Sequence, residues 1–320
     1  MMAVETGLLL KKVNIFTQIQ DLGRFGSARL GLSQGGVVDV TSARIANALV
    51  GNSQDAPLLE LGLGSLQFQA KGNVGIAVTG AMMSLSINGK PCSRYQHLNM
   101  LDGDTLDIGY SSSGFRCYLA VTGGFAVDPV LGSCSTVLRE RIGGVDGRPL
   151  QDGQFLPTTR SVSDFRSQSL PYHWQLKPKM MQQIPFVIGA QQPELGNDLL
   201  NRFVTGVYQI LPMSDRMGVR FRGSPLTSTC QSLISEGVCL GAIQLPADGQ
   251  PIVMLNDHQT IGGYPKIGAV TRLGVYALGQ CRPGSLVRFH LISAEEATAR
   301  ARKHEQWLTA VEQMFVGQNA

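Results

Sequence analysis

The chain has 320 residues, of which 43% are hydrophobic and 16% are charged, so it can bury a sizeable core and is not compositionally disordered. This length exceeds the usual size of a single core and predicts two domains. The formal net charge is only +4 and no run of lysines and arginines occurs, which argues against nucleic-acid or membrane partners. No segment is typical of a secretion signal or a membrane span, so we expect a cytoplasmic protein.

Short strands separated by turns dominate the pattern. The 38 glycines and 15 prolines predict many turns. Residues 83–87 alternate apolar and polar side chains and run into Asn88-Gly89, a dipeptide typical of tight hairpins. Residues 102–108 and 283–291 each combine a turn with an alternating strand. We therefore predict a mainly β protein with few helices.

Two segments have helical periodicity. Asp39 is placed to cap a helix that runs through residue 50 and stops at Gly51. Ser293 and Glu296 form a capping box for a C-terminal helix at residues 294–315.

A polar, proline-broken stretch between residues 160 and 185 predicts a domain boundary. We expect an N-terminal β-barrel domain at residues 1–170, a linker at 171–184, and a C-terminal β-barrel domain at 185–320 that includes the terminal helix.

Several short motifs are too weak to define a function. Residues 31–35 match G-x-S-x-G, but no buried apolar strand precedes Ser33, so a chance match is favoured. No P-loop, dinucleotide-binding fingerprint or H-E-x-x-H helix occurs, and the cysteines and histidines lack ligand spacing, so we expect no metal site. Lys179 precedes a methionine as in biotinylated proteins, but the Met before it is missing, and we interpret it as a solvated linker lysine.

Three polar segments that contain glycine are candidate sites for an anionic ligand. Their glycines would let backbone amides approach the anion, and Arg24, Arg216 or Lys266 could neutralise it. An alternative stays open, in which Asp21 with Arg24 and Asp215 with Arg216 are structural pairs that fix loops. The segments are residues 20–24, 214–218 and 256–266.

These segments lie in longer blocks that resemble the family of the 5-oxoprolinase C subunit, also described as allophanate hydrolase subunit 2 or biotin-dependent carboxyltransferase-like proteins. The blocks follow one order over nearly the whole chain, which makes them more specific than any short motif. They are QDLGR (20–24), RCYLAVTGGF (116–125), IGG (142–144), SDRMG (214–218), SEGV (235–238), GAIQLP (241–246) and QTIGGYPK (259–266).

The resemblance implies that the two domains are tandem cyclophilin-like β-barrels. It also implies a hydrolase complex with the A and B subunits of 5-oxoprolinase, which opens the cyclic amide of 5-oxoproline to L-glutamate at the expense of ATP. Which of the three subunits binds ATP stays open.

Stabilising charge on a lactam oxygen needs preorganised cations, and carboxylates can move a proton or orient an arginine. The expected catalytic residues are Arg24, Asp215, Arg216, Asp257 and Lys266. The expected substrate-binding residues are Asp21, Glu236, Gln244, His258, Gln259, Thr260, Gly262, Gly263 and Tyr264.

The chain departs from the family pattern at several positions. His258 and Cys134 stand where arginines are usual, and Val37-Val38 replaces Ala-Met. Losing a fixed guanidinium at 258 predicts weaker or pH-dependent anion binding there, or a different substrate.

Two alternative functions stay open. One is a regulatory protein that antagonises a histidine-kinase inhibitor through a partner resembling the B subunit. The other is a carboxyltransferase that acts on urea or another amide with carboxybiotin, and only this reading requires biotin.

Overall fold

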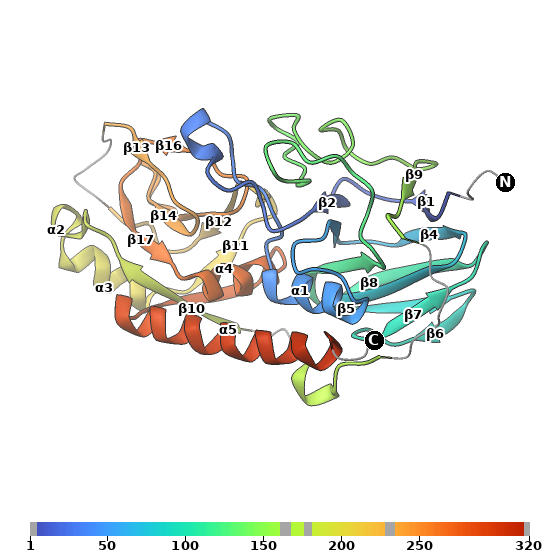
Figure 1. Cartoon of the computed structure of the whole chain (residues 1–320). Coiled ribbons are helices and arrows are strands. Elements are labelled where there is room, and N and C mark those ends of the chain that lie inside the picture. Colours follow the sequence, from blue (N-terminus) through green and yellow to red (C-terminus); the bar gives the residue numbers. More distant parts are fainter. Residues whose placement is uncertain (1–4, 161–167, 176–180, 228–233, 317–320) are drawn as a thin grey trace. The chain divides into compact units, whose positions relative to one another are not determined.

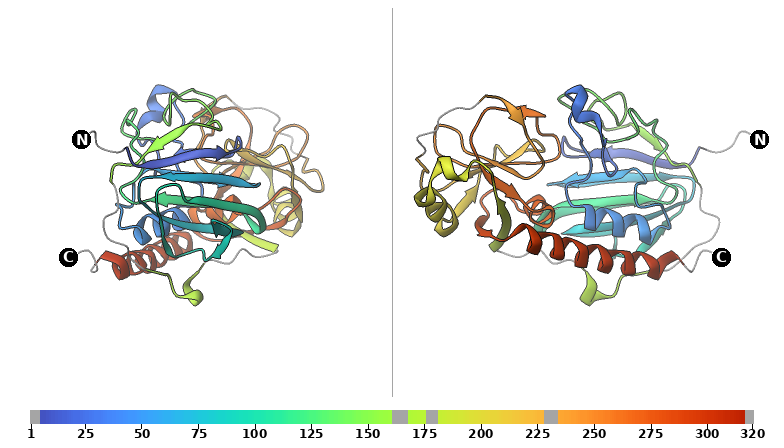
Figure 2. Two further views of the ribbon diagram at one scale, coloured as in Figure 1. Left: turned by 90° about the vertical axis from the view of Figure 1, so that its right-hand side faces the viewer. Right: turned by 60° about the vertical axis from the view of Figure 1, so that its left-hand side comes forward.

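The computed structural model describes residues 5–160, 168–175, 181–227 and 234–316 (Figures 1 and 2). The chain forms two compact units. The first unit comprises Met1–Arg24, Gly35–Pro178 and Trp307–Ala320, and the second comprises Phe25–Gln34 and Lys179–Gln306. Lys179 and part of the predicted linker, residues 176–180, lie outside the described residues. The domain boundaries proposed from the sequence stay a prediction.

The first unit is built on one curved sheet of nine strands, with every pair antiparallel. The main path is β2-β3-β8-β4-β1-β9, and the long strand β5 pairs with β8 and carries β6 and β7 at its other side. This path has two free ends among the described strands, so the sheet is a curled half-barrel. The strands are β1 (Gly7–Lys12), β2 (Gln18–Gln20), β3 (Leu58–Gly62), β4 (Leu66–Lys71), β5 (Val74–Ile87), β6 (Lys90–Cys92), β7 (His97–Met100), β8 (Thr105–Val121) and β9 (Phe155–Pro157).

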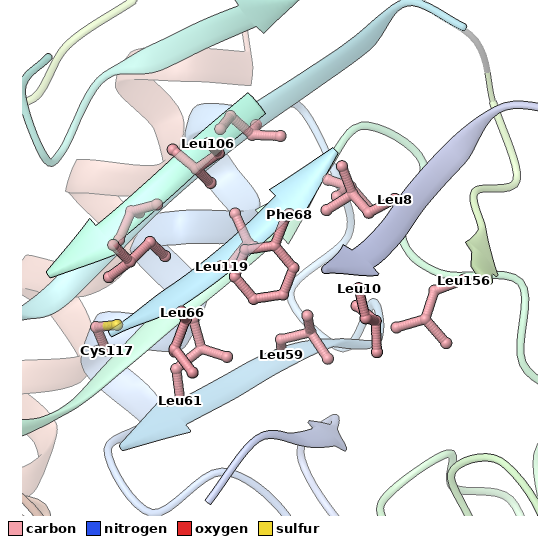
Figure 3. Packing of buried hydrophobic residues seen from close by; sticks show 14 of the residues in the cluster. Leu8, Leu10, Leu59, Leu61, Leu66, Phe68, Leu106, Cys117, Leu119 and Leu156 are labelled. Atoms are coloured by element: carbon pink, nitrogen blue, oxygen red, sulfur yellow. The ribbon is translucent and has the colours of Figure 1, made fainter. Parts of the chain in front are cut away.

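Alternating side chains on these strands fill the concave face of the sheet. Leu8 and Leu10 of β1, Phe68 of β4 and Leu106 of β8 are fully buried and pack together (Figure 3). Each buried aliphatic or aromatic side chain of this size stabilises the fold by about 1.5–3 kcal/mol relative to an exposed one. This core holds the first unit together without a disulfide among its described cysteines.

Helix α1 (Val40–Leu49) covers the outer side of β5 and β8 (Figure 1). The Asp39 side chain accepts the Ser42 amide at 3.2 Å, which confirms the predicted cap. Helix α5 (Ala294–Val316) is also confirmed, and the Ser293 hydroxyl accepts the Glu296 amide at its start. The C-terminal part of α5 packs its apolar residues, including Leu308, against α1.

The second unit contains a closed barrel of seven strands in the order β10-β17-β14-β15-β12-β11-β18. A parallel pairing of β10 with β18 closes the ring. The strands are β10 (Met181–Ile188), β11 (Tyr208–Ile210), β12 (Gly218–Arg222), β14 (Ala242–Gln244), β15 (Ile252–Met254), β17 (Lys266–Val270) and β18 (Leu286–Leu291). A separate two-stranded ribbon is formed by β13 (Glu236–Gly237) and β16 (Ile261–Gly262).

Aromatic side chains fill the barrel of the second unit. Helix α3 (Asn197–Thr205) inserts Phe203, which stacks on Phe289 with ring centroids 4.5 Å apart. The remaining elements are α2 (Gln192–Leu195), α4 (Arg272–Gly279) and the 3-10 turns η1 (Ser27–Leu30) and η2 (Tyr172–Trp174). The predicted mainly β class with two barrel-like sheets and a C-terminal helix is confirmed, with the first sheet open where the second is closed.

Candidate functional site

The polar segment at residues 20–24 lies in the first unit, where Asp21 organises a serine-rich loop. Its carboxylate accepts the hydroxyls of Ser133 at 2.7 Å and Ser135 at 2.5 Å. It also accepts the backbone amide of Cys134 at 2.6 Å. Burial raises the pKa of the Cys134 thiol to about 11, so the cysteine that replaces the usual arginine is a neutral thiol at neutral pH. Asp21 therefore fixes the conformation of this loop.

Arg24 supports the same loop from the other side. Its side chain is buried, and the guanidinium donates to the carbonyl oxygens of Val130 at 2.9 Å, Ser133 at 3.3 Å and Ser135 at 3.1 Å. These hydrogen bonds show that the Arg24 guanidinium holds the loop at residues 130–135 in place. Its catalytic role stays a prediction.

Arg216 forms a buried ion pair in the second unit. Its Nε and Nη2 atoms donate to the two carboxylate oxygens of Asp257 at 3.0 and 2.9 Å. The side chains are only 12% and 9% exposed. Asp215 does not take part, because its carboxylate accepts the backbone amides of Met217 at 2.8 Å and Gly218 at 3.1 Å. The pairing of neighbours suggested by the sequence is therefore replaced by a pairing with a residue further along the chain.

Ser33 of the G-x-S-x-G match is tied to the same turn. Its hydroxyl, which is buried, donates to the carbonyl oxygens of His258 at 2.8 Å and Asp257 at 3.2 Å. The His258 ring lies against the carbonyl of Gln259, with Nδ1 at 2.7 Å from the oxygen. A serine so engaged anchors the η1 segment and does not act as an exposed nucleophile.

Lys266 lies at the centre of a second polar group in this unit. Its ammonium contacts the carboxylate of Glu236 and the carbonyl oxygen of Gly237. The side chain of Gln191 bridges Lys266 and Glu236. Its oxygen accepts the backbone amide of Lys266 at 2.7 Å, and its nitrogen donates to the Glu236 carboxylate. The hydrogen bond from Lys266 lowers the pKa of Glu236. Gln191 was not predicted from the sequence.

Gln244 lies directly opposite Lys266 in the β14–β17 pairing, next to a β-bulge. The residue is only 1% exposed, and its Nε2 has no hydrogen-bond partner among the described residues. Gly262 of β16 covers this atom, since a Cβ at position 262 would lie 2.8 Å from it. A buried amide donor without an acceptor costs about 1–3 kcal/mol. Such a donor is expected where a ligand or a water oxygen is bound.

The loop at 256–265 brings further predicted residues to this place. The Thr260 carbonyl accepts the Val238 backbone amide at 2.9 Å. The side-chain nitrogen of Gln259 lies near Gly262, because a Cβ at position 262 would be 3.5 Å from it. Gly263 is partly buried and Tyr264 is 46% exposed in the same loop. We call Gln191, Glu236, Gln244, Gln259, Gly262 and Lys266 the Lys266 cluster.

The structure thus separates the predicted residues into three groups. Asp21 and Arg24 belong to the first unit, Arg216 and Asp257 form an ion pair, and the Lys266 cluster combines a cation with an amide nitrogen that has no partner in the described part of the chain. Within the described ranges, no group of three or more His, Cys, Asp or Glu side chains is placed to hold a metal. None of the described helices is both long and apolar enough to cross a membrane.

Known proteins resemble the chain over most of its length. The family model "Carboxyltransferase domain, subdomain A and B" matches residues 30–291. The C subunit of 5-oxoprolinase from Escherichia coli (strain K12) is 36% identical over 300 residues, which cover 93% of this chain and 95% of that protein.

Two solved structures share the fold. The structure of TTHA0988 has a TM-score of 0.79 at 31% identity, with 89% of this chain and 56% of that chain covered. The Kluyveromyces lactis urea carboxylase has a TM-score of 0.90 at 25% identity, with 97% of this chain and 30% of that chain covered. The chain therefore spans about half of the first protein and less than a third of the second.

Proposed function

Because the chain belongs to the carboxyltransferase-domain family that includes the 5-oxoprolinase C subunit, we propose that it is the C subunit of an ATP-dependent 5-oxoprolinase. This complex would open 5-oxoproline to L-glutamate, in the cytoplasm, together with the A and B subunits. The observation that carries the proposal is the match to a 5-oxoprolinase C subunit of which 95% is covered. The urea carboxylase is matched over only 30% of its length, so its whole activity is less well supported for this chain.

The Lys266 cluster fits the chemistry of the substrate. 5-Oxoproline has a carboxylate and a lactam carbonyl on one small ring. An ammonium suits the first group, and an amide N–H suits the second. Lys266 and Gln244 are cross-strand neighbours, whose Cβ atoms lie about 5 Å apart in such pairs. One small molecule can therefore reach both side chains.

Binding there requires two local changes. The carboxylate of the substrate would replace that of Glu236 on Lys266, and Glu236 is already 48% exposed, so its release into water costs little. The β13–β16 ribbon would have to lift, because Gly262 covers the Gln244 nitrogen. Each strand of this ribbon has only two residues, and so few hydrogen bonds oppose the movement.

The same side chains can stabilise the reaction. Activation of the lactam places negative charge on its carbonyl oxygen, and donors already fixed in position stabilise that charge with little reorganisation. Gln244 is fixed by burial, and Gln191 holds the backbone of Lys266 in place through its bond to the Lys266 backbone amide. ATP use belongs to the complex in this proposal, and the Lys266 cluster acts on the lactam wherever the complex holds the nucleotide.

Substitution within the reconstituted complex tests this site. Gln244→Leu and Lys266→Met should each lower the turnover of 5-oxoproline about 10²–10³-fold, which is the usual cost of losing one such donor. Gln209→Leu and Lys303→Met are matched controls, since both residues are exposed elsewhere on the second unit. The site is wrong if both variants assemble normally and turn over 5-oxoproline at the wild-type rate.

The two alternative functions give different outcomes in the same assays. A carboxyltransferase would consume urea in the presence of a carboxylated biotin carrier, and the fold shared with urea carboxylase makes this control necessary. A regulatory protein would bind a partner resembling the B subunit and show no turnover of either substrate.

A further inference from the structure

A pocket of about 370 Å³ lies in the second unit, beside helix α3 and strands β10 and β18. None of the residues of the Lys266 cluster lines it. Its volume is within the range of about 300–1,000 Å³ that is usual for small-molecule sites. The pocket is therefore a separate feature of the barrel.

The strand pattern explains why polar side chains face this pocket. Val287 and Phe289 of β18 point into the barrel, where both are buried, so the alternate residues Arg288 and His290 point outward. The parallel register places Gln183 of β10 beside Arg288. All three outward residues line the pocket.

Helix α3 supplies the opposite wall. Leu199 and Phe203 form its buried face, and the next positions around the helix, Leu200 and Val204, line the pocket as an apolar surface one turn long. Asn201 adds an amide group on the same wall. Phe289 and Leu291 of β18 also line the pocket, so its strand side mixes polar and apolar groups and its helix side is mainly apolar.

Among the described residues, Arg288 and His290 lie exposed on β18 without a partner for their side chains. The side chains of Arg288 and His290 form no ion pair or hydrogen bond with any described residue. No Asp or Glu is among the described residues that line the pocket. This differs from Arg24 and Arg216, whose guanidinium groups serve carbonyls or a carboxylate.

We propose that this pocket binds an organic oxyanion, with a carboxylate or phosphate group on Arg288 and an apolar body against α3. The planar guanidinium matches both oxyanions through paired hydrogen bonds. Gln183 and Asn201 can bind additional polar groups, and Leu200 with Val204 excludes water from an alkyl chain. The inference is independent of the 5-oxoprolinase proposal.

Binding of simple probes to the purified full chain tests the proposal. Hexanoate and hexyl phosphate separate the two oxyanions, and hexylamine has the same apolar body with the opposite charge. Calorimetry or ligand-observed NMR should show binding of at least one anion and none of the amine. Equal binding of all three probes, or no binding, would overturn the proposal.

Two substitutions assign the binding to this pocket. Arg288→Gln should weaken anion binding about tenfold or more, because the charge-assisted bonds are lost. Val204→Asp should abolish it by placing a carboxylate on the apolar wall. Arg222→Gln is the matched control, since Arg222 is exposed on β12 and does not line the pocket. Unchanged affinity in Arg288→Gln and Val204→Asp would show that the anion binds elsewhere.

Discussion

Substitution of Arg216 by methionine tests whether the Arg216–Asp257 pair is structural. The change keeps most of the side-chain volume and removes both hydrogen bonds to Asp257, of 3.0 and 2.9 Å. It leaves a carboxylate whose side chain is 9% exposed without its cation. Removing one partner of a buried pair costs about 3–5 kcal/mol, and we expect the lower end because neither side chain is completely desolvated.

Amide hydrogen exchange of residues 255–258 is the appropriate assay, because a two-unit chain need not unfold in one step. The Asp257 amide donates to the Arg216 carbonyl at 2.9 Å, so its exchange reports directly on this turn. A loss of about 3 kcal/mol corresponds to roughly 100-fold faster exchange. Adding Asp257→Asn to Arg216→Met should recover part of the protection, because no charge is then left buried.

Arg220→Met is the matched control, because Arg220 is exposed on β12. In this variant the amides of residues 255–258 should exchange at the wild-type rate. The structural reasoning is refuted if Arg216→Met also exchanges like the wild type. If the reconstituted complex then loses turnover, Arg216 acts on the substrate and not on the fold.

Three further predictions concern other parts of the chain. Glu312→Ala removes the two carboxylate oxygens that accept from Arg44 at 2.7 and 2.6 Å, and should cost about 2–4 kcal/mol, measured as faster exchange in residues 307–315. The exposed Cys239 should react with iodoacetamide at pH 8 well before Cys117, whose pKa is raised by burial to about 12; equal labelling would contradict this. Lys266 lowers the pKa of the Glu236 carboxyl. The stability that this ion pair adds is therefore complete above pH 4.5, the ordinary pKa of a glutamate, and is lost as the pH falls below it. Exchange of the Val238 amide, which donates to Thr260 beside Glu236, should therefore become equal in wild type and Glu236→Gln as the pH falls below 4.5, and a constant difference would contradict the ion pair.

Local patterns were sufficient for much of the fold. The alternation at residues 83–87 lies in β5, and the caps at Asp39 and Ser293 begin α1 and α5 as predicted, because caps and strand periodicity depend on neighbouring residues. Closure of the second barrel could not be predicted in this way. It depends on pairing Met181 with Leu286, and no local signal specifies partners so far apart.

The candidate site shows the same division. The resemblance to a family placed Glu236, Gln244 and Lys266 in one set, and the structure brings them together. The adjacency of Asp215 and Arg216 was a poor guide, because the carboxylate that binds Arg216 comes from a residue 41 positions away. Gln191 had no signal at all, since its role arises only where the end of β10 meets the start of β17.

As proposed above, this chain is a required component of a 5-oxoprolinase. The most direct measurement is the formation of L-glutamate from 5-oxoproline and ATP by the purified A and B subunits, with and without the chain. We predict ATP-dependent glutamate formation only when the chain is present. Equal turnover without the chain would contradict the account, as would urea carboxylation with a biotinylated carrier in place of 5-oxoproline turnover.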